Sequence, residues 1–208
     1  NPVPRELMRT VVAEVARAHG GSGDVEIEIS VPGGEALAKK TWNPRLGIVG
    51  GLSILGTTGV VIPFSCSAWI HSIHRGIDVA RATNLAHVAG STGKLSEAAV
   101  QQKFNLPDVA LLDMGDFVGG MLKYLRKKPV QRLTISGGFA KMVKLAQGNL
   151  DLHSSRSQVD FEKLSQTVAI CGGDDQQIRD TKSANTAKEV IDFCADLPLK
   201  DIIAKQAR

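Results

Sequence analysis

The sequence has 208 residues, of which 43% are hydrophobic and 22% charged, and this ordinary globular composition excludes a disordered, collagen-like or coiled-coil chain. The 25 basic and 21 acidic residues give a net charge of +4, and aromatic residues make up only 4%. Both values argue against nucleic acid as a partner, which needs a concentrated basic patch or stacking platforms. The basic run Arg126-Lys127-Lys128, with Arg132, is typical of a solvated helix end.

Cysteine usage and the longest uncharged stretch bear on the cellular compartment. Cys66, Cys171 and Cys194 form no CxxC pair, which argues against a disulfide framework or a zinc knuckle and favours a reducing cytoplasm. No charged residue occurs from Leu46 to Ile70, a length close to the roughly 20 residues of a membrane-spanning helix. Its glycines would leave backbone groups unsatisfied in lipid, so we expect residues 46–62 to be soluble core and loop, with no membrane partner.

Residues 1–82 are predicted to form a smaller α+β region. Apolar residues recur at helical spacing from Pro4 until Gly20 and Gly21 end the run. Residues 25–31 alternate between Val or Ile and polar residues, which predicts a half-buried strand. Further expected elements are a helix at 35–41, the glycine-rich core segment 46–62, and a helix at 66–82 capped by Ser65.

Residues 83–208 are predicted to form an α/β domain, because a short apolar run, a glycine turn and a helix recur three times. The expected helices cover about 94–104, up to 127, and up to 147, and each follows a turn that ends an apolar run. Consecutive βα units imply a parallel sheet with helices on both faces, which is a Rossmann-like arrangement. Helical stripes from Phe161 to Cys171 and from Ala187 to Cys194 complete the tail.

The turns after the predicted strands carry the residues best suited to a ligand. We expect Gly90–Gly93, Asp113–Asp116 and Gly137-Gly138 to meet at one edge of the sheet, because each turn follows a strand and opens a helix. Asp113 comes about 20 residues after the first turn, a separation at which a carboxylate reaches ribose hydroxyls. The predicted ligand is a nucleoside, and its contacts are Gly90, Thr92, Gly93, Asp113 and Asp116. Alternatively, these are ordinary small-residue turns, since the full GxGxxG pattern is absent.

Metal and hydrolase chemistry find little support. His71, His74 and Asp78 share one helical face, but two histidines and one carboxylate are few ligands, and no protein-bound metal is predicted. The GxSxG pattern that would position a nucleophilic serine does not occur.

Several long strings resemble one known family. They are Asn-Pro-Val-Pro-Arg at 1–5, the string from Val31 to Thr41, the string from Asn43 to Gly59, Met-Gly-Asp-Phe-Val-Gly at 114–119, and His153-Ser154. Together they resemble the cobalt-precorrin-5B (C-1)-methyltransferase family of anaerobic cobalamin biosynthesis. The resemblance runs in order through nearly the whole chain.

The resemblance implies methyl transfer from S-adenosylmethionine to C-1 of a cobalt corrinoid, with the cobalt carried by the substrate. Such a reaction needs alignment and water exclusion more than a catalytic triad. The resemblance leaves the oligomeric state open. Candidate catalytic residues are Asp116 and His153, and candidate contacts to the carboxylate-bearing substrate are Arg45, Thr57, Thr58, Lys94, Lys141 and Ser154. Asp116 is expected to bind the methyl donor, whereas Lys141 is expected to bind the macrocycle.

The sequence also departs from the family pattern. Gly138 and Ala140 stand where the family usually has histidine and glycine, and Asp151-Leu152 replaces the first two residues of its His-Thr-His-Ser string. The Thr/Gly/Ala-rich segment that precedes the Asn-Pro-Val-Pro string in the family is not part of this sequence. Two alternatives therefore stand beside the enzyme: a noncatalytic fragment that binds a nucleotide or tetrapyrrole, and a nicotinamide-dependent oxidoreductase.

Overall fold

The computed structural model describes residues 2–54 and 65–208. The chain divides into two compact units, residues 1–69 and residues 70–208, and each is described by itself. Thr57, Thr58 and the second half of the glycine-rich segment 46–62 lie outside the described residues. The boundary expected near residue 82 stays a prediction.

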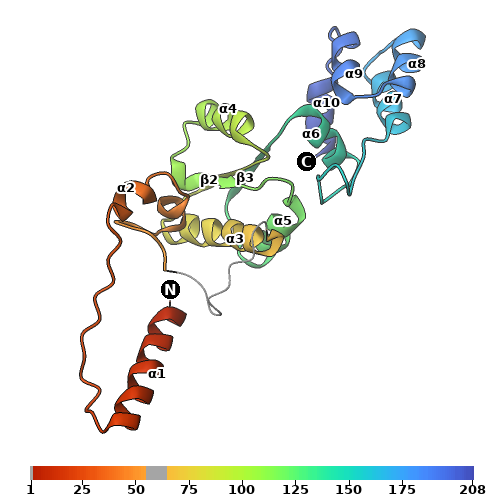
Figure 1. Cartoon of the computed structure of the whole chain (residues 1–208). Helices are drawn as coiled ribbons and strands as arrows, with labels where there is room; N and C mark the ends of the chain where they lie inside the picture. The colour runs from red at the N-terminus through yellow and green to blue at the C-terminus, as the bar shows by residue number, and fades with distance from the viewer. Residues whose placement is uncertain (1, 55–64) are drawn as a thin grey trace. The chain divides into compact units, whose positions relative to one another are not determined.

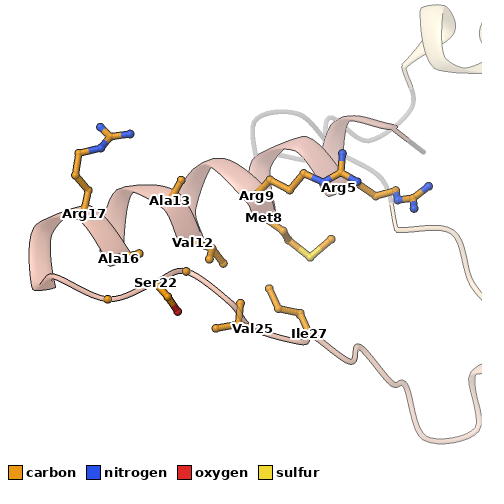
Figure 2. A pocket seen from close by; sticks show the side chains of 12 residues that line it. Arg5, Met8, Arg9, Val12, Ala13, Ala16, Arg17, Ser22, Val25 and Ile27 are labelled. Atoms are coloured by element: carbon orange, nitrogen blue, oxygen red, sulfur yellow. The ribbon is translucent and has the colours of Figure 1, made fainter.

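The first unit contains α1 (Pro2–His19), α2 (Gly34–Ala38) and the 3-10 helix η1 (Asn43–Leu46), all in the red to orange part of the chain (Figure 1). Met8 and Val12 of α1 point toward Val25 and Ile27 across a cavity of about 600 Å³ (Figure 2). The strand predicted at residues 25–31 is wrong, because this segment has no regular secondary structure. A strand needs a hydrogen-bonded neighbour, and the described residues of the first unit supply none for this segment.

The second unit contains the sheet. Its strands are β1 (His87–Ser91), β2 (Leu111–Asp113) and β3 (Arg132–Ser136), and they pair in parallel in the order β2-β1-β3. The helices that flank them are α3 (Cys66–Ala82), α4 (Lys94–Phe104) and α5 (Val118–Lys127), with the 3-10 helix η2 (Asp108–Ala110) before β2. The expected cap of α3 is confirmed, since the Ala68 N–H donates to Ser65 Oγ at 3.2 Å.

Alternate residues of the strands enter different cores, as the period of a strand requires. Val88 and Leu112 belong to a buried cluster with α3 and α5, which includes Ile77 and Met121. Ala89 and Leu111 belong to another cluster, which is completed by Val100 of α4 and its neighbours. The mixed α/β architecture with a parallel sheet is therefore confirmed, and helices cover both of its faces.

The remaining helices build a third core. They are α6 (Phe139–Ala146), α7 (Phe161–Ile170), α8 (Asp175–Ser183), α9 (Ala187–Phe193) and α10 (Leu199–Gln206). Val143, Leu164, Val168 and Val190 are fully buried here, and Cys194 lies among them, as expected of a packing cysteine. Burial raises the pKa of the Cys194 thiol, which keeps it protonated. No helix in the described part of the chain is long and apolar enough to span a membrane.

Candidate functional site

The three polar turns meet at the carboxyl ends of the strands. Ser91 of β1 pairs with Asp113 on one side and with Ser136 on the other. The Thr92 N–H donates to the Ser136 carbonyl at 3.0 Å, and the Met114 N–H donates to the Ser91 carbonyl at 3.0 Å. The predicted convergence of these turns at one sheet edge is therefore confirmed.

The first and third turns lie in close contact. A Cβ atom at Gly137 would come within 2.9 Å of the Thr92 Cγ2 atom, so this approach requires glycine. On the first turn, Gly93 precedes α4 without a side-chain cap, and Gly93 and Lys94 are exposed. Because glycine has no side chain, Gly93 cannot cap the N–H groups in the first turn of α4. The buried hydroxyl of Ser91 beneath this turn has no hydrogen-bond partner in the structure.

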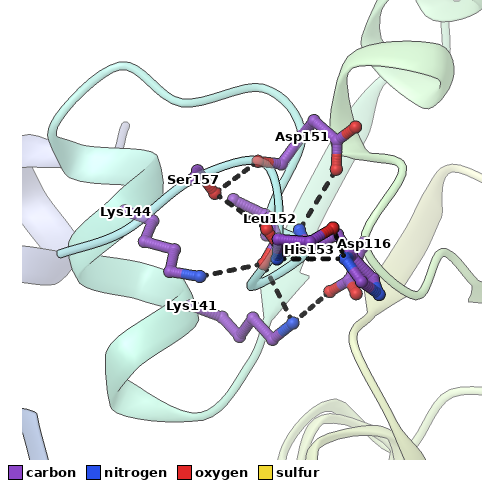
Figure 3. A network of polar contacts seen from close by, with 8 residues as sticks. Asp116, Lys141, Lys144, Asp151, Leu152, His153 and Ser157 are labelled. Carbon is purple, nitrogen blue, oxygen red and sulfur yellow. Dashed lines mark hydrogen bonds and ion pairs between the residues drawn. The ribbon is translucent and has the colours of Figure 1, made fainter. Parts of the chain in front are cut away.

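Asp116 and Lys141 form an ion pair across the second and third turns (Figure 3). Their side chains are 22% and 30% exposed, so the pair stands at the edge of the core and within reach of a ligand. The Lys141 ammonium also donates to the Leu152 carbonyl at 3.0 Å. We predicted from the sequence that these two residues bind separate ligands, whereas in the structure they pair with each other.

Lys144 is the residue of this network that sequence reasoning did not select. It is 5% exposed, and its ammonium donates to the same Leu152 carbonyl at 3.2 Å (Figure 3). Burial lowers the pKa of Lys144, and the charge of Lys141 lowers it further. Lys144 stands between the apolar residues Val143 and Leu145, which are also buried, and this position is a local signal that could have marked it.

Backbone hydrogen bonds hold the segment that supplies this carbonyl against α5. The Leu152 N–H donates to the Asp116 carbonyl at 3.0 Å, and the Gly119 N–H donates to the Leu150 carbonyl at 2.8 Å. His153 and Ser154 follow at once, and both are exposed. The His153 N–H donates to Asp151 Oδ1 at 3.1 Å. His153 thus directly follows Leu152, which is hydrogen bonded to Asp116, Lys141 and Lys144.

The structure places most of the sequence-predicted residues at this edge. Arg45 belongs to the other unit, and Thr57 and Thr58 lie outside the described residues. Gly90 lies within β1 and is buried against Met114 and Met121. The other predicted residues lie at strand ends, on turns, at helix starts or on the segment beside α5, and they are Thr92, Gly93, Lys94, Asp113, Asp116, Lys141, His153 and Ser154. In chemical terms the edge combines backbone N–H groups, two carboxylates and two ammonium groups, which suits a ligand that carries both signs of charge.

The helix that carries His71, His74 and Asp78 uses these side chains in protein contacts. The His74 ring stacks on Tyr124, and Asp78 accepts a hydrogen bond from the Tyr124 hydroxyl at 2.8 Å. Among the residues that the structure describes, no three His, Cys, Asp or Glu side chains gather as they would around a metal ion.

Comparison with known proteins brings in two family models and a set of close relatives. The model described as CbiD matches residues 1–63, and the model described as CbiD, C-terminal domain, matches residues 151–208. A protein of Paramagnetospirillum magneticum named cobalt-precorrin-5B C(1)-methyltransferase is 61% identical over 208 residues, which cover 100% of this chain and 58% of that protein. A protein of the same name from a Bradyrhizobium species is 58% identical over 209 residues, covering 100% and 56%.

A solved structure gives a weaker match. It is the cobalamin biosynthesis protein cbiD of Archaeoglobus fulgidus, 31% identical, with 61% of this chain and 40% of that chain covered at a TM-score of 0.29. The chain spans a little more than half the length of the two relatives named above. With CbiD models matching at both of its ends and identity near 60% along its whole length, the chain belongs to the CbiD family.

Proposed function

We propose that this chain takes part in S-adenosylmethionine-dependent methyl transfer to C-1 of cobalt-precorrin-5B. Its relatives are named for methyl transfer to that carbon of that substrate. The observation that carries the proposal is the meeting of three polar turns and the Asp116–Lys141 pair at one edge of a parallel sheet. Ligands of open α/β sheets gather at this edge. The chain spans only part of its relatives' length, so the proposal assigns it a share of the site.

The methyl donor is proposed to lie over the turn after β1. The chain adds β2 on one side of β1 and then crosses over to add β3 on the other side. A Rossmann-like sheet binds its ligand at such a change in the direction of strand order. In this arrangement the β1 turn and the α4 N-terminus face the methionyl carboxylate and the ribose. Asp113 and Asp116 supply acceptors for hydroxyl or ammonium groups. The contacts proposed are Gly90, Thr92, Gly93, Asp113 and Asp116.

The chemistry asks little of the protein beyond placement. The methyl group moves from the sulfonium sulfur, which keeps the electron pair of the broken bond, to carbon C-1 of the macrocycle. Asp116 can stabilise the positive charge of the donor, and exclusion of water from the edge strengthens that attraction. His153, next to the Asp116 network, is the candidate proton acceptor.

The remaining proposed contacts concern the cobalt corrinoid, whose peripheral carboxylates suit cationic and hydroxyl side chains. The proposed partners are Arg45, Thr57, Thr58, Lys94, Lys141 and Ser154. Cobalt enters as part of this substrate and needs no protein ligand. The proposed place of action is the cytoplasm.

Calorimetric titration of the chain with S-adenosylmethionine and, separately, with NAD tests the proposal. We expect binding of the first and none of the second. Asp116→Asn should weaken S-adenosylmethionine binding by about ten- to hundredfold, because a charge-assisted contact contributes about 1.5–3 kcal/mol. Asp192→Asn on α9 is the matched control and should change the affinity less than twofold, since Asp192 is 60% exposed and pairs with Lys188.

The titration results distinguish the methyltransferase from the oxidoreductase and from the noncatalytic fragment. Binding of NAD alone would favour an oxidoreductase and overturn the proposal. Binding of S-adenosylmethionine, without methyl transfer to an added cobalt-precorrin, would support the noncatalytic fragment that the partial length of the chain allows. Equal loss of affinity in both Asp variants would remove Asp116 from the site.

A further inference from the structure

A groove lies between α3 and α5, on residues that the proposed site does not use. Its volume is about 730 Å³. Two of its lining residues come from α3 and the others from α5. The lining consists of Ile70, His74, Gly120, Lys123, Tyr124, Arg126 and Lys127.

One wall of the groove is a rigid pair of flat rings. His74 and Tyr124 stack with their ring centres 4.1 Å apart and their planes 9° from parallel. Each ring makes a polar contact within the protein: His74 Nε2 lies 3.3 Å from the Gly120 carbonyl, and the Tyr124 hydroxyl donates to Asp78. That hydrogen bond raises the pKa of Tyr124, so the hydroxyl stays protonated. The two rings therefore present an aromatic surface of fixed orientation to the groove.

The rim of the groove is cationic. Lys123, Arg126 and Lys127 are exposed, and no acidic side chain is among the described residues that line the groove. Asp78 is occupied by Tyr124 and by Arg75, which lies 3.3 Å away. The helix dipole alone would account for cations in the last turn of α5. It does not account for Lys123, one turn earlier, or for the stacked rings beside it.

Neighbouring residues of α5 contact the segment of the proposed site and line the groove. Asp116 and Gly119 are bonded through the backbone to Leu152 and Leu150, and the groove starts one residue later at Gly120. From Gly120 to Lys127, α5 rises by about 10 Å at 1.5 Å per residue. The α5 residues that line the groove therefore extend over about the width of one planar macrocycle.

We propose that this groove holds the carboxylate-bearing edge of the corrinoid substrate, with the His74–Tyr124 wall against the macrocycle and Lys123, Arg126 and Lys127 paired with its carboxylates. This inference rests on the proposed function. It assigns a ligand to the basic run that the sequence presents as a solvated helix end, and it adds residues to the substrate contacts predicted from the turns.

Equilibrium dialysis of the chain with two cobalt corrinoids tests the proposal. The probes are cobyrinic acid, which has free peripheral carboxylates, and cobinamide, in which they are amides. Wild type should bind cobyrinic acid more tightly, and added salt should weaken that binding. The variant Lys123→Gln/Arg126→Gln/Lys127→Gln should bind cobyrinic acid about tenfold more weakly, with a smaller salt dependence.

A control variant removes the same charge elsewhere. Lys200→Gln/Lys205→Gln/Arg208→Gln changes exposed residues at the C-terminal end and should bind within twofold of wild type. Tyr124→Leu, checked for folding by circular dichroism, should weaken both corrinoids, since it removes the wall but no charge. Both triple variants should keep wild-type affinity for S-adenosylmethionine.

Each result bears on one claim. Unchanged cobyrinic acid binding in the groove variant, or equal losses in the two triple variants, would overturn the groove and leave the proposed function standing. Failure of wild type to bind either corrinoid would also overturn the groove. Failure of wild type to bind S-adenosylmethionine, with cobyrinic acid still lost in the groove variant, would overturn the methyl transfer and support a tetrapyrrole-binding groove.

Discussion

The two units of the chain share the same kind of apolar periodicity but differ in what it buries. In the second unit, Leu164 and Val168 of α7 are 0% exposed, and they pack with residues from other helices. In α1 of the first unit no residue is buried, and Leu7 and Val11, on one stripe, are 46% and 56% exposed. A periodic pattern thus predicts a face, while burial of that face depends on a partner that the pattern does not name.

Amide hydrogen exchange should show the largest contrast. The N–H groups of β1 lie in a central parallel strand, so their exchange should require opening of the sheet. Residues 25–31 have no regular secondary structure and should exchange close to the rate of an unfolded peptide. We expect the rates to differ by about 10³-fold or more, measured by mass spectrometry of peptic fragments. Similar protection in both segments would show that the first unit is as firmly packed as the second.

Truncation of a leucine in each unit should give the next largest effect. Leu164→Ala should lower the free energy of unfolding by about 2–5 kcal/mol, because it opens a cavity in a closed core. Leu7→Ala, the same change on an exposed stripe, should shift it by less than about 0.5 kcal/mol. Urea denaturation followed by circular dichroism measures both. A cost for Leu7→Ala near that of Leu164→Ala would contradict the comparison.

Local patterns predicted much of the second unit. The predicted helices at 66–82 and 94–104 match α3 and α4, and the turns fall where the strands end. Where the residues that decide the structure lie close in sequence, pattern suffices: α8 begins with a capping box of Asp174 and Gln177 that could have been recognised as a helix start. The segment 25–31 fails the same reasoning, because pairing is a property of two segments.

The candidate site divides in the same way. The positions of the turns follow from strands and helices, and their convergence was predictable. The pairing of Asp116 with Lys141 was not, because it joins side chains that are 25 residues apart. The burial of Lys144 depends on the carbonyl of Leu152, which a segment without regular structure brings to it. A local pattern can indicate that Lys144 lies in a buried stretch, but it does not identify the partner of either lysine.

A glycine substitution tests how tightly the segment with His153 is held within the second unit. A Cβ atom at Gly119 would come within 3.0 Å of the Leu150 Cβ and carbonyl oxygen atoms, so Gly119→Ala must move that backbone. We expect a loss of about 1–3 kcal/mol in the free energy of unfolding. Gly138→Ala is the control, since it meets nothing within 4 Å, and its φ of −60° suits alanine. Equal stability of the two variants would show that the contact between Leu150 and α5 is loose.

The smallest expected effect concerns the one lysine buried in the candidate site. Burial lowers the pKa of Lys144 below its ordinary value of 10.5, so between the two values the unfolded chain binds more protons than the folded one. The cost of the buried ammonium is therefore fully present below the folded pKa, and it disappears as pH rises toward 10.5. Lys144→Met removes this contribution, so its free energy of unfolding relative to wild type should fall as pH rises from 7 to 10.

Lys188→Met provides the control for this pH dependence. Lys188 is exposed and hydrogen bonded to Asp192, which raises its pKa above 10.5, so it stays mostly protonated in both states over that pH range. Its difference from wild type should stay constant between pH 7 and pH 10. Urea denaturation at each pH measures both differences. If the two variants run parallel to wild type, the Lys144 ammonium is as well solvated in the folded chain as in the unfolded one, and the network at Leu152 is open to water.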